Sequence, residues 1–267
     1  MNKNIKYFLP PILIDLIRLF RAYKLKGKNK FLKQNALWYN HFKNEKVLII
    51  GNGPSLKDID LNLIKGRNVI VMNSFENASW KDSVKIVAHC IGEPSMVSAW
   101  SKDDIKKSIK GTNANSYWLH FTSFGHFNDI EKKDLLHYAF ITHEPGIWGQ
   151  KRIDLTSPTL TFQTTAQLAI QVALHMGFND IGLLGFDHDW LANPDYSRHF
   201  YSNEKDDFDT LHEMTYLQVV NMIDRMWRIY YKLNEIADYS KVKIRNLTQK
   251  SYLDVFKNDT LENFLNE

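Results

Sequence analysis

Hydrophobic residues in the body of the chain gather in short runs that longer stretches of mixed polarity separate. The main runs are Val47–Ile50, Val69–Met72, Val84–Ala88 and Ile181–Leu184. Aliphatic runs of this length predict buried strands. Val242–Ile244 is a shorter run, and it predicts the last strand before a short terminal helix.

The strongest helical pattern covers Thr165–Met176. Thr164 and Gln167 are spaced as a capping-box pair at its start, and Gly177 is a typical terminator at its end. A longer helix is predicted over Asp209–Ala237. Strands that alternate with helices at this spacing indicate a parallel α/β sheet.

These elements predict one Rossmann-like domain over residues 45–267, in which helices flank a parallel sheet. A chain of 267 residues is long enough for one large domain or two small ones. Residues 101–150 break the alternation, because they are rich in aromatic, histidine and polar side chains with weak periodicity. We interpret them as a lid or an insertion.

A different pattern precedes this domain. Ile12, Leu13, Leu16, Ile17 and Phe20 recur at helical spacing, and basic side chains lie nearer the other side. The apolar stretch has about 14 residues, fewer than the roughly 20 that a membrane-spanning helix needs. The pattern therefore predicts an amphipathic basic helix within a segment that covers residues 1–40.

Charge is unevenly distributed along the chain. Residues 1–34 hold nine basic residues and one acid, a net charge of +8, which leaves −4 for the rest of a chain whose total is +4. A basic amphipathic helix is typical of a segment that lies on an anionic membrane surface, and a helix docked on the domain is the alternative. The mildly acidic body argues against a nucleic-acid partner.

A single cysteine, Cys90, cannot form an intrachain disulfide. This favours a reducing compartment. Together with the basic segment, it predicts a cytoplasmic protein that is peripheral on the inner face of the cytoplasmic membrane.

Gly51-Asn52-Gly53-Pro54-Ser55 directly follows the first predicted strand, where open α/β sheets place a ligand-binding turn. Glycines let the backbone approach a phosphate, and the free N–H groups of a helix that begins at Pro54 and Ser55 favour an anion. The turn lacks the third glycine of a dinucleotide fingerprint and the lysine of a P-loop. It predicts a phosphate-binding turn of another kind, and a tight strand-to-helix turn is the alternative.

Further polar residues fall at the same predicted edge of the sheet. Asn73 follows the second strand, and its amide can read a sugar or a base because it both donates and accepts hydrogen bonds. Thr164 and Thr165 precede the strongest helix, where hydroxyl and N–H groups can hold a carboxylate or a phosphate. A turn asparagine and plain helix capping are the alternatives.

Asp187, His188 and Asp189 follow the strand Ile181–Leu184. Carboxylates at this edge commonly coordinate magnesium, and a structural role in the turn is the alternative.

Two imidazoles and two phenols further along the chain are the candidates for catalysis: Tyr196, His199, Tyr201 and His212. A histidine of near-neutral pKa can accept the proton of an attacking hydroxyl, and a tyrosine hydroxyl can stabilise a leaving phosphate.

The Gly51–Leu56 turn, Asn73, the helix after Thr164 and the segment Gly177–Asp187 together resemble the bacterial family 42 sialyltransferases. They resemble still more closely the MptE-like domains of bacterial polysaccharide loci, a family named for an archaeal 6-hydroxymethylpterin diphosphokinase. The resemblance covers about residues 45–255. It implies a shared nucleotide-binding frame that carries different reactions.

The resemblance to the sialyltransferases also implies roles for single residues. The contacts with a CMP-sugar fall on Asn52 and Asn73, and the hydroxyl at the helix start falls near Thr165. The base that deprotonates the acceptor hydroxyl falls on His212, with His199 as the rival.

The tyrosine pair that contacts the departing phosphate in that family has no full match. Asp189 stands where the first tyrosine would align, and Tyr196 or Tyr201 replaces only the second. This departure from the family's pattern argues against sialyl transfer in particular.

We therefore predict a glycosyltransferase of bacterial surface-glycan biosynthesis that needs no cofactor. Its donor would be a nucleotide-activated, CMP-linked sugar, sialic-acid-like or other, and its acceptor a glycan or a lipid-linked glycan. One alternative is a diphosphokinase that uses ATP, with magnesium on Asp187 and Asp189. Another is a membrane-recruited scaffold that keeps the fold without the chemistry.

Overall fold

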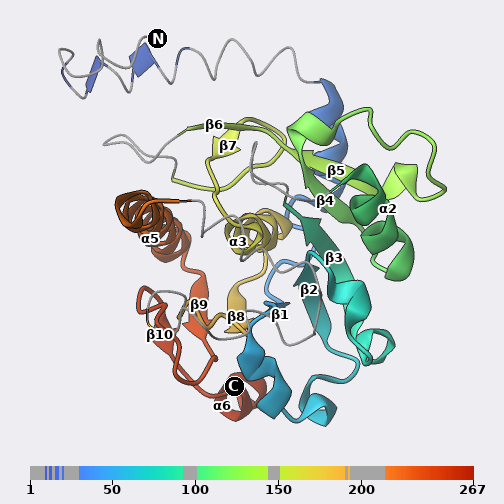
Figure 1. Ribbon diagram of the computed structural model, residues 1–267, viewed down its shortest axis with the longest axis vertical. Coiled ribbons are helices and arrows are strands. Elements are labelled where there is room, and N and C mark those ends of the chain that lie inside the picture. Colours follow the sequence, from blue (N-terminus) through green and yellow to red (C-terminus); the bar gives the residue numbers. More distant parts are fainter. Residues whose placement is uncertain are drawn as a thin grey trace.

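The computed structural model describes residues 30–92, 101–143, 151–189 and 214–267, together with seven single positions: Pro10, Ile12, Leu13, Leu16, Ile17, Phe20 and Ala192. Within these ranges the chain forms an eight-stranded sheet with helices on both faces (Figure 1). Every pairing in the sheet is parallel. The predicted α/β fold with a parallel sheet is confirmed.

The order of the strands reverses beside β1. In sheet order they are β10 (Lys257–Asn258), β9 (Lys243–Asn246), β8 (Asp180–Leu184), β1 (Lys46–Ile50), β2 (Asn68–Met72), β3 (Lys85–Ile91), β4 (Tyr117–His120) and β5 (Leu136–Ala139). The chain runs from β1 outward to β5 on one side and adds β8 on the other. Open α/β sheets bind ligands at the carboxyl ends of strands where the order reverses in this way. β6 (Ile141–His143) and β7 (Thr159–Leu160) pair separately.

The four main hydrophobic runs form strands as predicted. β3 begins one residue later than expected and continues to Ile91, because His89 and Cys90 are buried inside it despite their polar atoms. The run at Val242 is not the last strand, since β10 follows β9. β10 consists of two exposed polar residues, so no hydrophobic run in the sequence predicts it.

Alternating side chains of the strands feed two cores. In β1, Val47 and Ile49 belong to the core beneath α3 (Thr165–Met176) and α5 (Tyr216–Tyr239). Leu48 and Ile50 belong to the opposite core, which α2 (Lys102–Gly111) and α6 (Leu261–Asn266) cover. Strands buried on both faces are expected to be nearly continuous in hydrophobic residues, as these are.

The structure confirms helix α3 with the predicted bounds. Gly177 ends it in the left-handed region at φ +87°. The predicted capping pair is present in one direction only, because Thr164 Oγ1 accepts from Gln167 N at 3.4 Å whereas Gln167 Oε1 accepts from Gln163 N. Gln167 is thus shared between the cap and the preceding loop.

The long helix predicted over residues 209–237 is α5. It begins at Tyr216, after a capping box made by Thr215 and Gln218, and it runs to Tyr239. Residues 209–213 lie outside the described part of the chain.

The interpretation of residues 101–150 as a lid or an insertion is wrong for residues 102–139. They supply α2 and two strands of the main sheet, β4 and β5. Buried Tyr117, Trp118, His120 and His137 occupy strand positions where aliphatic residues would have given a recognisable run. Residues 144–150 lie outside the described ranges.

Short 3₁₀ helices make most of the remaining connections: η2 (Lys30–Trp38), η3 (Pro54–Asp58), η4 (Leu61–Ile64), η5 (Phe75–Asn77), η6 (Lys81–Ser83), η7 (Phe121–Ser123) and η8 (Lys133–Leu135). η2 docks on the domain through Asn35, whose Nδ2 donates to the carbonyl oxygens of Tyr138 at 2.9 Å and Leu155 at 2.7 Å. The end of the basic segment therefore packs against β5.

Nearer the amino terminus, Ile12, Leu13, Leu16, Ile17 and Phe20 are helical, as their spacing predicts. All but Ile17 are residues that are between 40% and 59% exposed. Among the described residues, no helix has both the length and the apolar character needed to cross a membrane.

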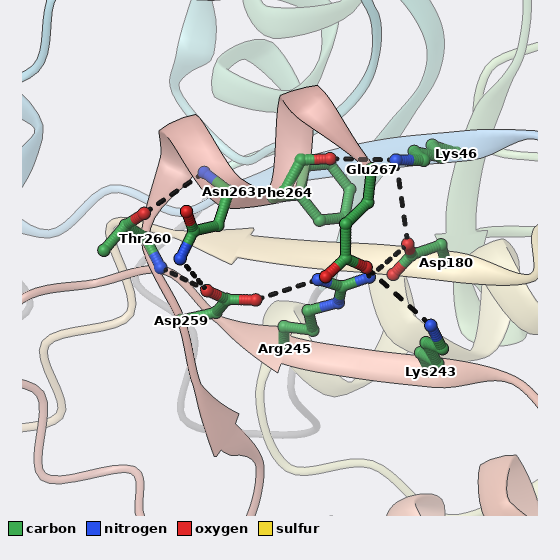
Figure 2. Close-up of polar contacts among 9 residues, drawn as sticks. All are labelled: Lys46, Asp180, Lys243, Arg245, Asp259, Thr260, Asn263, Phe264 and Glu267. Atoms are coloured by element: carbon green, nitrogen blue, oxygen red, sulfur yellow. Dashed lines mark hydrogen bonds and ion pairs between the residues drawn. The ribbon is translucent and has the colours of Figure 1, made fainter.

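A charged cluster lies where β8 and β9 begin, opposite the carboxyl ends of the strands (Figure 2). The guanidinium of buried Arg245 bonds to Asp180 at 2.7 Å, to Asp259 at 2.8 Å and to Glu267. Lys46 reaches Asp180 at 4.0 Å and donates to the carbonyl oxygen of Phe264. The cluster ties α6 to the sheet.

Candidate functional site

The carboxyl ends of β1, β2 and β8 bring together most of the residues predicted to bind a nucleotide. The turn 51–55 follows β1, Asn73 follows β2, and Asp187 follows β8. Thr165 is the first residue of α3, whose start reaches the same edge: its hydroxyl donates to Asn73 Oδ1 at 2.9 Å. Residues separated by more than a hundred positions in the sequence thus form one site.

The glycine turn packs tightly on the segment after β8. Gly51 N donates to Leu184 O at 2.7 Å, and Gly53 N donates to Gly185 O at 3.0 Å. A Cβ atom on Gly51 would lie 2.2 Å from Gly185 O, and one on Gly53 would lie 1.6 Å from Asp187 Oδ2. Glycine is needed at both positions because another segment occupies the space of a side chain.

Asp187 takes the place predicted for a bound anion. Ser55 Oγ donates to Asp187 Oδ2 at 2.9 Å, and Ser55 N donates to Asp187 Oδ1 at 3.3 Å. Partial burial raises the pKa of this carboxyl group, whereas its bonds to Ser55 lower it and nearby Asp189 raises it. The carboxylate is therefore held by the turn itself.

The prediction that the turn offers its N–H groups to a phosphate needs correction. The N–H groups of Gly51, Gly53 and Ser55 are all engaged within the protein. The helix expected from Pro54 is a 3₁₀ helix of five residues, too short for a substantial dipole. The turn presents the side chain of Asn52 instead.

Asn52 contains a buried acceptor without a partner. Its residue exposure is 8%, and its Nδ2 donates to Met72 O at 3.4 Å. Its Oδ1 has no hydrogen-bond partner within the described part of the chain. A buried acceptor left unpaired costs about 1–3 kcal/mol, so such an atom at a sheet edge indicates that a ligand or water donates to it.

Asn73 is placed to recognise a ligand with its amide. Thr165 Oγ1 is closer to Asn73 Oδ1, at 2.9 Å, than to its other acceptor Gly92 O, at 3.3 Å, and this contact orients the amide group. The Nδ2 of Asn73 makes no hydrogen bond to any residue that the structure describes. The Asn73 backbone lies in the left-handed region at φ +49°. Asparagine tolerates this conformation better than most residues.

Sequence reasoning missed the residues that hold Asn73 in place. Its carbonyl oxygen faces His89 Nε2 at 2.7 Å and Ser108 Oγ at 2.6 Å, and both side chains are buried. The sequence pattern could have identified His89, since a histidine interrupts an apolar strand there. It could not have identified Ser108, because a serine on a polar helix is common.

His188 links the segment after β8 to two helices. Its Nε2 lies 2.9 Å from the Tyr230 hydroxyl of α5, which lies 3.5 Å from Thr164 Oγ1 at the cap of α3. Burial lowers the pKa of His188 to about 4, so the ring is neutral near pH 7. The hydrogen bond between neutral His188 and Tyr230 belongs to a chain of contacts that fixes the loop carrying Asp187.

The residues proposed as magnesium ligands stand near each other, but the donor set is small. Asp187 is engaged by Ser55, and Asp189 influences it electrostatically. The described residues contain no group of three or more histidine, cysteine or acidic side chains that could hold a metal ion.

The four predicted catalytic residues, Tyr196, His199, Tyr201 and His212, lie outside the described residues.

The comparisons with known proteins found similar solved structures, among them sialyltransferases. No protein-family model matches the chain. No curated protein matches its sequence. The monofunctional α-2,3-sialyltransferase Cst-I of Campylobacter jejuni matches 82% of this chain over 81% of its own, with a TM-score of 0.51 and 15% identity.

A complex of the C. jejuni sialyltransferase CstII with cytidine-5′-monophosphate matches 81% of this chain over 85% of its own, with a TM-score of 0.48 and 18% identity. The chain has the fold of Cst-I. The likeness to Cst-I confirms a Rossmann-like α/β architecture. None of these findings supports the predicted kinship with the MptE-like domains or the diphosphokinase alternative.

Proposed function

We propose that this chain is a glycosyltransferase that uses a CMP-linked sugar as its donor. The fold shared with Cst-I, a sialyltransferase, supports the reaction class. The resemblance of the turn, Asn73 and the α3 start to family 42 sialyltransferases supports the CMP-linked donor. The observation that carries the proposal is the Oδ1 of Asn52 at the carboxyl edge of the sheet, for which the described residues supply no hydrogen-bond donor.

The chemistry of the Asn52 acceptor limits which part of the donor can contact it. A phosphate dianion has no proton to donate, whereas ribose hydroxyl groups and the amino group of cytosine do. We therefore assign the nucleoside part of the donor to the neighbourhood of Asn52, with Asn73 Nδ2 beside it. Asp187, which the turn already binds, would repel a phosphate placed on the turn.

The phosphate has a better position at the start of α3. The first N–H groups of a helix have no partner within it and favour an anion, and α3 has twelve residues. The N–H of Gln167 is engaged by Thr164, whereas no residue in the described ranges accepts from the N–H groups of Thr165 and Ala166. The start of α3 thus replaces the glycine turn as the proposed phosphate contact.

The reaction would be a direct displacement at the anomeric carbon. His212 or His199 would remove the proton of the acceptor hydroxyl while that oxygen attacks and the bond to the nucleotide phosphate breaks. Tyr196 or Tyr201 would donate a hydrogen bond to the departing phosphate. These assignments come from the sequence.

A thermal-shift panel of CMP, UDP, GDP and ATP, each with and without magnesium, tests the donor. A ligand at a hundred times its Kd stabilises the folded protein by about 2.7 kcal/mol. We expect metal-independent stabilisation by CMP that is lost in Asn52→Ala. Asn68→Ala is the matched control, since Asn68 begins β2 at the opposite edge and bonds to Glu45.

Stabilisation by ATP with magnesium alone, lost in Asp187→Ala, would overturn the proposal and favour a diphosphokinase. Binding of CMP that Asn52→Ala leaves unchanged would overturn the assignment of the nucleoside to Asn52. Unchanged cellular function in the double variant His199→Ala, His212→Ala would indicate a scaffold without catalysis.

We further propose that the basic segment binds an anionic membrane surface and holds the enzyme at the inner face of the cytoplasmic membrane. The net charge of +8 over residues 1–34 and the exposed apolar side chains of Ile12, Leu13, Leu16 and Phe20 support it. If the acceptor is lipid-linked, attachment to the membrane keeps the active site at the same surface as the acceptor.

A further inference from the structure

A buried polar network converges on the backbone carbonyl of Asn73. His89 of β3 and Ser108 of α2 approach this one oxygen at 2.7 Å and 2.6 Å. The Asn73 backbone is left-handed at φ +49°, a conformation that costs energy outside glycine and needs support from its surroundings. Two donors on one carbonyl oxygen supply such support and fix the orientation of the peptide.

The protons of His89 can be assigned by counting. A carbonyl oxygen only accepts, so His89 Nε2 carries the ring proton and donates to Asn73 O. Its Nδ1 then accepts from the Thr112 hydroxyl at 2.9 Å, so the single proton of that hydroxyl goes to His89 and not to the more distant carbonyl oxygen of Ser108 at 3.3 Å. Complete burial lowers the pKa of His89 to about 4, which agrees with a neutral ring.

The single hydroxyl proton of Ser108 indicates the protonation state of Glu76. Its hydroxyl oxygen lies 2.6 Å from Asn73 O and 2.8 Å from Glu76 Oε2. The hydroxyl has one proton, and an oxygen–oxygen contact of either length without a proton is repulsive. Both contacts are favourable only when Glu76 carries a proton, which it donates to Ser108, while Ser108 donates to Asn73.

The surroundings of Glu76 favour its neutral form. Burial is the largest influence and raises the pKa of this carboxyl group, although the bond to Ser108 lowers it. The facing charges, both on α2, are Lys107, which lowers the pKa, and Asp104, which raises it. Gly111 admits Glu76 to this site, because a Cβ on Gly111 would lie 2.6 Å from Glu76 Cβ.

We infer that Glu76, Ser108 and His89 are positioning residues that hold Asn73 for nucleotide binding, and that Glu76 is protonated in the binding-competent form. This inference rests on the proposed function, which makes Asn73 a contact of the donor. Ionisation of Glu76 removes one proton from the network and leaves Ser108 to choose between two acceptors. The affinity for the nucleotide then falls as the pH rises.

The first test needs no ligand. Carbon-13 carboxyl NMR follows the ionisation of each glutamate with pH, and the Glu76 signal is identified by its absence in Glu76→Gln. We expect Glu76 to ionise at higher pH than the exposed glutamates, with the side-chain amide signals of Asn73 moving at the same midpoint. Ionisation together with the exposed glutamates, or an Asn73 that does not respond, would overturn the network.

The second test measures the Kd of CMP by calorimetry over the same pH range. Glu76→Gln can donate to Ser108 at every pH, so we expect it to keep the low-pH affinity of the natural chain and to lose the pH dependence specific to Glu76. Ser108→Ala should bind about fivefold more weakly throughout, the effect of one lost hydrogen bond. Glu131→Gln, at an exposed site, is the control for the change in charge.

The NMR titration and the calorimetry together distinguish a failure of the proposed role of Glu76 from a failure of the proposed CMP-linked donor. Protonation of CMP itself affects all variants equally, so the difference between the natural chain and Glu76→Gln is the measurement. Equal pH dependence in both would overturn the role of Glu76 in binding. A correct NMR signature without any CMP binding would overturn the CMP donor and leave a network that holds Asn73 for some other purpose.

Discussion

At the scale of single residues, the glycine turn makes a steric prediction. Gly53 has an ordinary φ of −63°, so an alanine there meets no backbone strain, but its Cβ would collide with Asp187. We expect Gly53→Ala to lower the free energy of unfolding by about 1–3 kcal/mol, as overpacking does. It should also weaken CMP binding, because Asp187 or the turn must move.

Gly66→Ala provides the contrast. Gly66 lies at φ +69°, and a Cβ added to it would meet no atom within 4 Å, so an alanine there has strain but no collision. The expected cost is about 1 kcal/mol with CMP affinity unchanged. Urea unfolding and calorimetry on both variants measure the two effects, and equal CMP affinities would show that the turn does not shape the site.

The site residues divide into those that sequence can find and those that it cannot. Asn52, Asn73 and Thr165 are polar residues placed just beyond strands or before a helix, and parallel topology brings such positions to one edge. The role of Asp187 as the partner of Ser55 depends on a contact across 132 positions of sequence. Only the folded structure reveals that this carboxylate occupies the anion position.

At the scale of elements, the attachment of α6 depends on Arg245. Its guanidinium is buried between Asp180 of β8 and Asp259 after β10 (Figure 2). Arg245→Leu leaves Asp180 buried with only a distant lysine, so we expect a loss of about 3 kcal/mol in unfolding free energy. Arg228→Leu, which breaks an exposed pair with Asp224, should cause no measurable change in the urea midpoint.

The same cluster predicts an acid-sensitive stability. Bonding to Arg245 lowers the pKa of Asp259 from 3.8 to about 2, so its ionised form stabilises the fold above about pH 4. That contribution disappears as the pH falls through about 2, where Asp259 is protonated in both states. The stability difference between the natural chain and Asp259→Asn should therefore shrink over this window in urea titrations. A difference that stays constant with pH would show that the ion pair does not stabilise the fold.

The elements themselves were predictable where burial leaves a simple pattern. β1, β2 and β8 are buried on both faces and consist mostly of aliphatic residues. β4 and β5 are equally buried, but Trp118 and His137 stack on each other within them and replace the aliphatic signal. Aromatic and histidine pairs fill the same space as valine or leucine, and local pattern alone cannot distinguish them from a polar loop.

At the scale of the whole molecule, the uneven distribution of charge predicts that the proposed membrane contact and the proposed nucleotide site can be tested separately. The positive charge is concentrated in residues 1–34, whereas the remainder carries −4. Binding to anionic lipid should therefore depend on the basic segment and fall steeply with salt, because each basic residue near such a surface contributes about 1 kcal/mol. Nucleotide binding should not depend on the basic segment.

Replacing Lys24, Lys26, Lys28 and Lys30 by glutamine should weaken binding to phosphatidylserine vesicles at least about tenfold, measured by co-sedimentation at low salt. The matched control replaces four exposed lysines of the body, Lys65, Lys85, Lys102 and Lys110, and changes the net charge equally. If net charge alone governed binding, both variants would lose affinity alike. If the segment acts as an amphipathic helix, only the first variant should dissociate, and its thermal shift with CMP should match that of the natural chain. Loss of CMP binding in the first variant would instead assign the segment to the active site.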